Sequence, residues 1–243
     1  MSLDAAGAYI NSCTELPSRR IELDNTKQVV TISQGSTSSG ISGRTGVAVW
    51  NSCLLLTRFI TSSTPVSNTL FKSKDVLELG CGTGLASIGA STVASKVIAT
   101  DGNPEVCLLT KANMQKNSPG VAVQELLWGS VEVPPDLYSS MDTIYGSDLT
   151  YNTGSWRVLG ETMNSILKND GKVVYLATGH QGLAVDGELD GFVTVVSSMG
   201  LKVNSKLTGE ANFELDKLLS AQEKEILAAN GGRARIVVLD NKV

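Results

Sequence analysis

A glycine-rich segment in the first half of the chain has the composition of a ligand-binding loop. The sequence DVLELGCGTGLASI places Gly80, Gly82 and Gly84 between an apolar run and a helical pattern. Glycines suit such a strand-to-helix turn because side chains resist its backbone angles and because a ligand must approach the backbone closely. In open α/β sheets this turn lies in the crevice at the carboxyl ends of the strands, where ligands bind. The segment therefore predicts a cofactor-binding loop.

Two carboxylates near this loop favour one kind of cofactor. Asp101 ends the next apolar run, nineteen residues after Gly82, where it can accept hydrogen bonds from both hydroxyls of a ribose. Glu78 precedes the first glycine by two residues. Its negative charge suits a ligand with a cationic amino group and would repel a pyrophosphate. A dinucleotide loop needs a last glycine or alanine where this chain has Leu85 or Ser87. The alternative is a tight turn that binds no ligand.

The elements that must position this loop alternate along the chain. Apolar runs predict strands at 76–79, 96–100, 121–125, 142–146, 172–177, 201–206 and 235–239. Apolar residues at helical spacing predict helices over about 46–60, 85–93, 104–117, 155–168, 189–199 and 215–229. This alternation predicts an α/β fold with a parallel-rich sheet and helices on both faces.

The residues before this region predict a short extension. Residues 19–32 contain two short runs around a polar break at 24–26, which indicates a β-hairpin. Residues 33–43 are rich in Gly and Ser and predict a flexible connection, because they offer little apolar surface to offset the entropy of ordering. A functional lid is the alternative for that segment. We therefore expect an N-terminal extension, 1–43, and a main domain, 44–243.

The overall composition disfavours several classes of protein. The 20 Lys and Arg nearly balance the 24 Asp and Glu, and a net charge of −4 gives no electrostatic reason to bind nucleic acid or an anionic membrane. No apolar run approaches the roughly 20 residues that span a bilayer, and the first twenty residues do not resemble a signal peptide. Four dispersed cysteines and one histidine, His180, argue against a disulfide framework or a metal site. We expect a cytoplasmic monomer with reduced thiols.

Four motifs together resemble methyltransferase family 16, the non-SET protein lysine methyltransferases. They are T-G-V-A-V-W (45–50), E-L-G-C-G-T-G (78–84), L-L-W-G (126–129) and D-L-T-Y (148–151), in that order and at suitable spacing. The resemblance runs from about residue 44 to 180. It implies a Rossmann-like sheet of seven strands with an antiparallel C-terminal strand, and S-adenosyl-L-methionine as cofactor. It also implies a protein substrate that presents a lysine, such as an elongation factor or a chaperone.

The resemblance, together with the charge argument for Glu78, assigns roles to matching positions. The expected cofactor-binding residues are Trp50, Glu78, Gly80, Gly82, Gly84, Asp101, Trp128 and Ser147. Asp148 and Tyr151 are the expected catalytic residues, facing the methyl acceptor. No metal is implied.

These roles make chemical sense, and each has a structural alternative. An indole such as Trp128 can stack on adenine, although a core tryptophan would look the same; Trp50 is equally divided between core and cofactor. Asp148 can orient a lysine head group and only secondarily accept its proton, while Tyr151 can wall a channel that favours cations. Alternatively, Asp148 caps a helix and Tyr151 packs beside it. His180 would lie on the same rim, as a solvated residue or a substrate contact.

Other functions stay open at this level. Methyl transfer to a protein histidine or a small-molecule amine is the nearest rival. A nicotinamide-dependent oxidoreductase lacks the required last glycine, and a non-catalytic cofactor-binding protein is the third alternative. The absence of prolines at 148–151 disfavours methylation of planar amides or adenine amino groups. Lysine methylation is favoured because the rivals do not explain Trp50, Trp128 and the 148–151 motif together.

Overall fold

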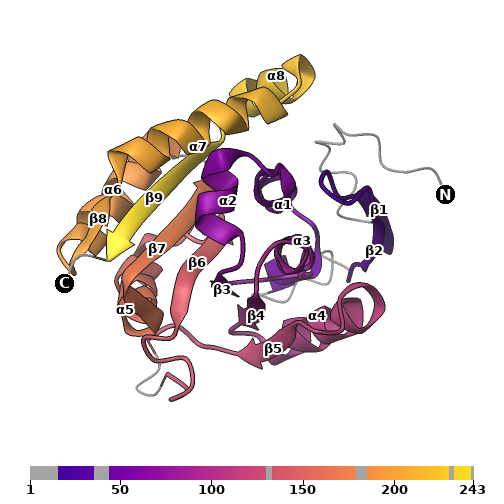
Figure 1. Ribbon diagram of the computed structural model, residues 1–243, viewed down its shortest axis with the longest axis horizontal. Helices are drawn as coiled ribbons and strands as arrows, with labels where there is room; N and C mark the ends of the chain where they lie inside the picture. Colours follow the sequence, from indigo (N-terminus) through magenta and orange to yellow (C-terminus); the bar gives the residue numbers. More distant parts are fainter. Residues whose placement is uncertain (1–15, 36–43, 130–132, 179–184, 230–232, 242–243) are drawn as a thin grey trace.

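A central sheet carries the site. The structure is a computed structural model that describes residues 16–35, 44–129, 133–178, 185–229 and 233–241. Within these residues the sheet has seven strands in the order β5-β4-β3-β6-β7-β9-β8 (Figure 1). Their bounds are β3 (Asp75–Glu78), β4 (Lys96–Asp101), β5 (Ala122–Glu125), β6 (Met141–Ser147), β7 (Leu167–Ala177), β8 (Leu201–Val203) and β9 (Arg235–Asn241).

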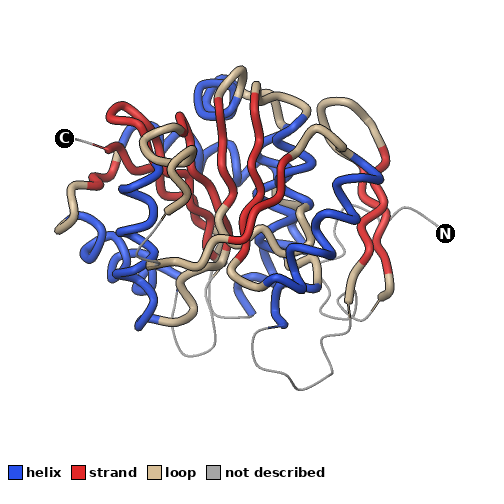
Figure 2. Tube along the Cα trace, turned by 90° about the horizontal axis from the view of Figure 1, so that it is seen from below, coloured by secondary structure: helices blue, strands red, loops and turns tan. Residues whose placement is uncertain are grey.

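The strand directions confirm a Rossmann-like, mostly parallel sheet. Strands β3 to β7 pair in parallel, and β9 is antiparallel to both of its neighbours, β7 and β8. The last strand of the chain is thus inserted between two earlier ones (Figure 1). Figure 2 shows the strands of the sheet with helices around them. Because β4, β3 and β6 are adjacent and parallel, the residues that follow Glu78, Asp101 and Ser147 meet at one edge of the sheet.

Helices cover both faces, as the alternation of elements predicts. One face is covered by side chains of α1 (Asn51–Thr61), α2 (Pro65–Phe71), α3 (Leu85–Ser91), α4 (Pro104–Asn117), α7 (Ser205–Leu218) and α8 (Ala221–Ala229). The other face is covered by α5 (Trp156–Ile166) and α6 (Val185–Ser197). Burial of these apolar faces is the main force that holds the layers together.

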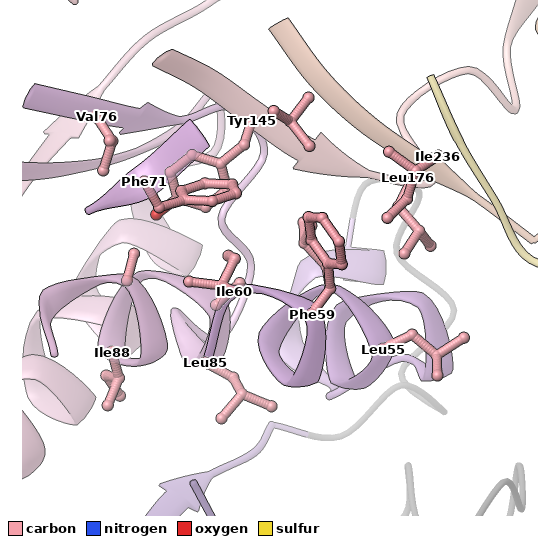
Figure 3. Packing of buried hydrophobic residues seen from close by; sticks show 14 of the residues in the cluster. Leu55, Phe59, Ile60, Phe71, Val76, Leu85, Ile88, Tyr145, Leu176 and Ile236 are labelled. Atoms are coloured by element: carbon pink, nitrogen blue, oxygen red, sulfur yellow. The ribbon is translucent and has the colours of Figure 1, made fainter. Parts of the chain in front are cut away.

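Aromatic side chains fill the core of the first face. Phe71 of α2 meets the ring of Tyr145 of β6 edge-on, with 5.5 Å between ring centroids (Figure 3). Phe59 of α1 meets Phe71 in a similar arrangement at 6.5 Å. Leu85 of α3 is buried in the same cluster. The helix that follows the glycine loop is therefore anchored in a closely packed layer.

The N-terminal hairpin is present where the sequence predicts it. Strands β1 (Ser18–Glu22) and β2 (Val29–Ser33) pair antiparallel and lie beside α4 (Figure 1). Val30 and Ile32 are buried in the core of the first face. Asn117 of α4 holds β2 through Thr31, accepting from its N–H at 3.1 Å and donating to its carbonyl oxygen at 3.0 Å.

Several expected boundaries are wrong near the site. The helix expected from Gly46 begins at Asn51, and residues Arg44–Val47 form a short 3-10 helix, η2. Helix α2 was not expected, although Thr64 followed by proline is a typical helix start, and its hydroxyl accepts from the Ser67 N–H. Residues 36–43 of the expected flexible connection lie outside the described residues.

The second half of the chain differs in more detail. Strand β7 begins at Leu167 rather than 172, because an irregularity in its pairing with β6 absorbs the polar residues 168–171. The strand expected over 201–206 ends at Val203, since Asn204 caps α7 through the Leu207 N–H. The single helix expected over 215–229 is divided between α7 and α8.

Candidate functional site

The glycine loop has a backbone that only glycine adopts without strain. Gly80, Gly82 and Gly84 all lie in the left-handed region, with φ of +60°, +53° and +84°. A Cβ on Gly80 would lie 2.5 Å from a methyl carbon of Leu149, and one on Gly82 would lie 3.0 Å from the Gly46 carbonyl oxygen. The loop is thus in close contact with the chain on both sides. This arrangement agrees with a backbone built for close approach.

Helix α4 holds the loop from one side. Thr110 donates from Oγ1 to the Gly82 carbonyl oxygen at 2.5 Å, and Asn113 donates from Nδ2 to the Thr83 carbonyl oxygen at 2.9 Å. These bonds fix the direction of two loop carbonyls, while the N–H groups of Cys81 and Gly84 donate to the Thr100 and Cys81 carbonyl oxygens. The buried hydroxyl of Thr83 has no hydrogen-bond partner among the described residues. A buried hydroxyl without a partner costs free energy, so the loop is not fully satisfied by the hydrogen bonds of the described residues.

Asp101 stands beside this loop, where the sequence predicts it. Its Oδ2 accepts from the Gly82 N–H at 3.2 Å and its Oδ1 accepts from the Asn103 N–H at 3.0 Å. The side chain is half-buried, and this burial raises its pKa above the ordinary value, opposed by these backbone hydrogen bonds. Each carboxylate oxygen has a second lone pair, so the group retains the capacity to accept from ligand hydroxyls.

Glu78 occupies a different position from the one expected. Its side chain is only 2% exposed and lies behind the loop, where Ser87 donates from Oγ to its Oε2 at 2.5 Å. The Ser87 hydroxyl lies 3.2 Å from that of Tyr145, so the cluster continues into the core. Burial raises the pKa of Glu78 to about 8. The structure does not bring Glu78 among the exposed groups of the site, and its carboxyl supports the loop from within the core.

The two tryptophans flank the loop in different ways. Trp50 is 42% exposed, so the core alternative is wrong for it, and its Nε1 donates to the Thr45 carbonyl oxygen at 2.6 Å. This bond closes segment 45–50 on itself, and the segment packs Gly46 against the glycine loop. Trp128 is half-buried, and its ring lies next to Gly80. A Cβ on Gly80 would lie 3.7 Å from Trp128 Cζ2, an ordinary van der Waals contact. Trp128 is thus adjacent to the loop and still accessible.

The turn after β6 brings the expected acceptor-facing residues to the same edge. Ser147 ends β6 and is half-buried. Asp148 has an unusual φ of +50°, and its Oδ1 and Oδ2 accept from the Thr178 N–H at 2.9 Å and hydroxyl at 2.7 Å. Tyr151 is 58% exposed. The alternative of a helix cap is wrong, because α5 begins at Trp156 after Ser155 and Tyr151 does not pack in the core.

Leu149 joins the two halves of the site. Its side chain is buried and lies between two glycines, because a Cβ on either Gly80 or Gly146 would come within 2.6 Å of it. The glycine loop and the 148–151 turn are therefore packed against each other through one leucine. Sequence reasoning missed Leu149 and Thr178, since an apolar residue inside a motif and a threonine after a strand carry no distinctive signal.

The remaining polar features do not join this site. Asp142 lies at the opposite edge of the sheet, in a hollow of about 610 Å³ that Lys168 also lines. Burial alone would raise the pKa of Asp142, but the hydrogen bond from Lys168 at 2.8 Å outweighs it, and the pKa is lowered. His180 lies outside the described residues. In the part of the chain that the structure describes, no group of three potential metal ligands occurs, and no helix is long and apolar enough to cross a membrane.

The fold and site define a class of proteins with the methyltransferase fold. A TehB-like SAM-dependent methyltransferase from Corynebacterium glutamicum superimposes with a TM-score of 0.52 at 16% identity, covering 77% of this chain and 88% of that one. The cyclase SpnF superimposes with a TM-score of 0.53 at 15% identity, covering 82% and 84%. These similarities establish the fold alone.

Sequence similarity identifies the family. Residues 26–182 match methyltransferase family 16, described as lysine methyltransferase, and the chain belongs to this family. Protein N-lysine methyltransferase METTL21A of Danio rerio is 35% identical over 52% of this chain and 59% of its own length. Calmodulin-lysine N-methyltransferase of Arabidopsis thaliana is 37% identical over 40% of this chain and 34% of its own. Protein-lysine N-methyltransferase EFM3 of Chaetomium thermophilum is 32% identical over 58% and 44%. The chain thus spans about half the length of these relatives or less.

Proposed function

We propose that this protein transfers a methyl group from S-adenosyl-L-methionine to a lysine side chain of another protein. The observation that carries the proposal is the convergence of the glycine loop, Asp101 and the 148–151 turn at one edge of the sheet. Relatives of the same family are named as lysine methyltransferases of proteins, one of them of calmodulin. This support favours a protein amine over the histidine and small-molecule alternatives.

The residues of the site fit such a donor. Asp101 would accept from the ribose hydroxyls, Trp128 would stack on the adenine, and the glycines of the loop would let the amino-acid part approach the backbone closely. Trp50, in the segment whose Gly46 packs against the loop, and Ser147, at the end of β6, would add contacts to the donor. The bound donor supplies an electrophilic methyl group carried on a sulfonium.

The acceptor side must present a neutral amine in line with that methyl group. Asp148 is held rigidly by Thr178 and would orient the lysine head group, while exposed Tyr151 would wall the channel beside it. The lysine loses its proton before transfer, to water or to Asp148. Placement of the two reactants, rather than strong acid–base chemistry, is the main contribution of these residues.

Calorimetric titration with S-adenosyl-L-methionine tests the cofactor first. We expect binding of S-adenosyl-L-methionine and none of NAD, with affinity about 10- to 100-fold weaker in Asp101→Ala, since hydrogen bonds to a charged group are lost. Asp216→Ala, on the exposed surface of α7, is the matched control and should bind as the wild type does. Binding of NAD instead, or of neither, would overturn the proposal.

Labelling then tests the acceptor. The protein is incubated with tritiated S-adenosyl-L-methionine and the total protein of source cells that lack it, and the hydrolysate is analysed for methyl-lysine. Label in methyl-lysine supports the proposal, whereas label only in methyl-histidine or in small molecules contradicts it.

We further propose that the protein acts in the cytoplasm as a monomer, which fractionation and light scattering would test. The boundary between 1–43 and 44–243 stays a prediction.

A further inference from the structure

The 148–151 turn rests on a tyrosine that the sequence does not single out. Tyr175 of β7 is fully buried, and its hydroxyl lies 2.9 Å from the Leu149 nitrogen, 3.1 Å from the Thr150 nitrogen and 2.6 Å from Thr150 Oγ1. A single phenol thus holds two consecutive backbone N–H groups and a side-chain hydroxyl of the turn. Its ring is fixed in turn by Phe192 of α6, with ring centroids 5.5 Å apart.

The directions of these hydrogen bonds follow from the number of lone pairs. The two N–H groups occupy both lone pairs of the phenol oxygen, so the phenol proton must point to Thr150 Oγ1. The Thr150 hydroxyl then donates to Oε1 of buried Glu188, with which it is hydrogen-bonded. Burial, followed by the charge of Asp148, raises the pKa of Tyr175 well above its ordinary range, so the phenol keeps its proton.

The rest of the turn is bound with equal completeness. Trp156 donates from Nε1 to the Thr150 carbonyl oxygen at 2.8 Å, so the N–H, carbonyl and hydroxyl of Thr150 are all occupied. Thr178 binds both carboxylate oxygens of Asp148, and the Asp148 N–H donates to the Leu176 carbonyl oxygen at 3.0 Å. The bonds come from three elements: β7 with the residue after it, α5 and α6.

This completeness matters because Asp148 has a backbone conformation that few residues with a side chain adopt. Its φ of +50° costs less for Asp than for most such residues, and the surrounding contacts hold it. The contacts here come from the buried Tyr175 and Glu188 and from the half-buried Thr178 and Trp156, while Tyr151 at the other end of the turn is 58% exposed. The turn thus begins at a half-buried carboxylate whose orientation is fixed and ends at an exposed phenol.

We infer that Tyr175 and Thr178 are positioning residues for methyl transfer, which fix Asp148 and Tyr151 toward the acceptor and, through Leu149, hold them in register with the glycine loop. The inference rests on the proposed function. Neither residue is placed in contact with the donor, so both act through the turn. Their loss should therefore slow turnover without changing donor affinity.

Three variants of the full chain test this inference. Tyr175→Phe keeps the ring and removes the hydroxyl, Thr178→Val keeps the shape and removes one bond to Asp148, and Thr178→Ser restores that bond as the conservative control. Initial rates of methyl-lysine formation are measured against total protein of source cells that lack the enzyme, over a series of protein concentrations at saturating donor. Calorimetry with S-adenosyl-L-methionine and thermal unfolding are measured on the same samples.

We expect kcat to fall about 10- to 100-fold in Tyr175→Phe and Thr178→Val, corresponding to loss of one or two buried hydrogen bonds in the reacting state. Donor affinity should stay within about twofold, and Thr178→Ser should recover most of the rate. Folded variants with wild-type kcat would overturn the inference and leave the proposed function standing. A wild type that binds the donor and forms no methyl-lysine would instead overturn the proposed function.

Amide exchange at residues 149 and 150 should accelerate in Tyr175→Phe, and unchanged exchange there would also contradict the inference.

Discussion

At the scale of single residues, three carboxyl groups that look alike in the sequence have three different environments. Glu78 is buried against Ser87, Asp101 is half-buried on loop N–H groups, and Asp148 is held by Thr178 at the edge. Only the last two are partly exposed. The difference arises because the side chain of Glu78, the last residue of β3, points into the layer of helices, where Ser87 of α3 binds it.

The burial of Glu78 makes stability depend on pH. Its pKa is about 8 in the folded protein against 4.5 ordinarily, so between these values the folded state holds a proton that the unfolded state lacks. The free energy of unfolding should therefore fall as pH rises, by about 1.4 kcal/mol per pH unit from this group, and level off above its folded pKa. Glu78→Gln, which does not titrate, should gain on the wild type between about pH 5 and about pH 8 in urea unfolding. Glu210→Gln, on exposed α7, is the control; parallel curves for Glu78→Gln and wild type would contradict the assignment.

The position of Gly82 should tolerate only glycine. Replacement by alanine imposes a left-handed φ on a side chain and places its Cβ 3.0 Å from the Gly46 carbonyl oxygen. We expect Gly82→Ala to lose about 1–3 kcal/mol of stability and about tenfold or more in affinity for S-adenosyl-L-methionine, by calorimetry. Gly120→Ala, where the added Cβ meets open space, should change neither. Equal binding by both variants would show that the loop tolerates a side chain at its centre.

At the scale of elements, the sequence predicts the strands, which apolar runs mark, and misses the helix boundaries that depend on side-chain caps. The sequence predicts all seven strands of the sheet because each contains a short apolar run, even β5 and β8, which are largely exposed. It also predicts the place of Asp101, which ends β4. Helix α2 and the division of α7 from α8 depend on single caps at Thr64 and Asn204 and on a reciprocal Ser220–Glu223 pair, signals too short to stand out. The insertion of β9 between β7 and β8 is a long-range pairing, which local patterns do not reveal.

Helix α4 provides the clearest test at this scale, because two of its asparagines hold the same hairpin and only one reaches the loop. Asn113 exchanges hydrogen bonds with Ser33 at 2.9 and 3.1 Å and also donates to the Thr83 carbonyl oxygen, whereas Asn117 binds Thr31. We expect Asn113→Ala to lose about 2–4 kcal/mol of stability and to bind S-adenosyl-L-methionine more weakly. Asn117→Ala should lose stability and keep the affinity of the wild type. Equal affinity for S-adenosyl-L-methionine in the two variants would show that the bond from Asn113 to the loop does not contribute to donor binding.

At the scale of the whole molecule, the fold constrains chemistry only loosely. A cyclase has the same architecture, with a TM-score of 0.53. The activity therefore depends on the residues at the carboxyl ends of the strands and not on the sheet itself. The fold does specify how the parts are coupled. The hairpin, the helices of the first face and the back of the sheet share one core, which includes Val30, Leu85 and Tyr145.

This shared core predicts that the hairpin unfolds together with the sheet rather than as a separate extension. Ile32 is fully buried in it, whereas Val29 on the same strand is 36% exposed. We expect Ile32→Ala to lower the free energy of unfolding of the whole protein by about 2–4 kcal/mol with an unchanged dependence on denaturant, because one cooperative unit is destabilised. Val29→Ala, the matched control, should lose less than about 1 kcal/mol. Far-ultraviolet dichroism and tryptophan fluorescence should give coincident transitions in all three proteins. An early transition confined to the hairpin, with Ile32→Ala leaving the main transition in place, would instead establish residues 1–43 as an independent extension and would place the structural boundary where the composition of the chain changes.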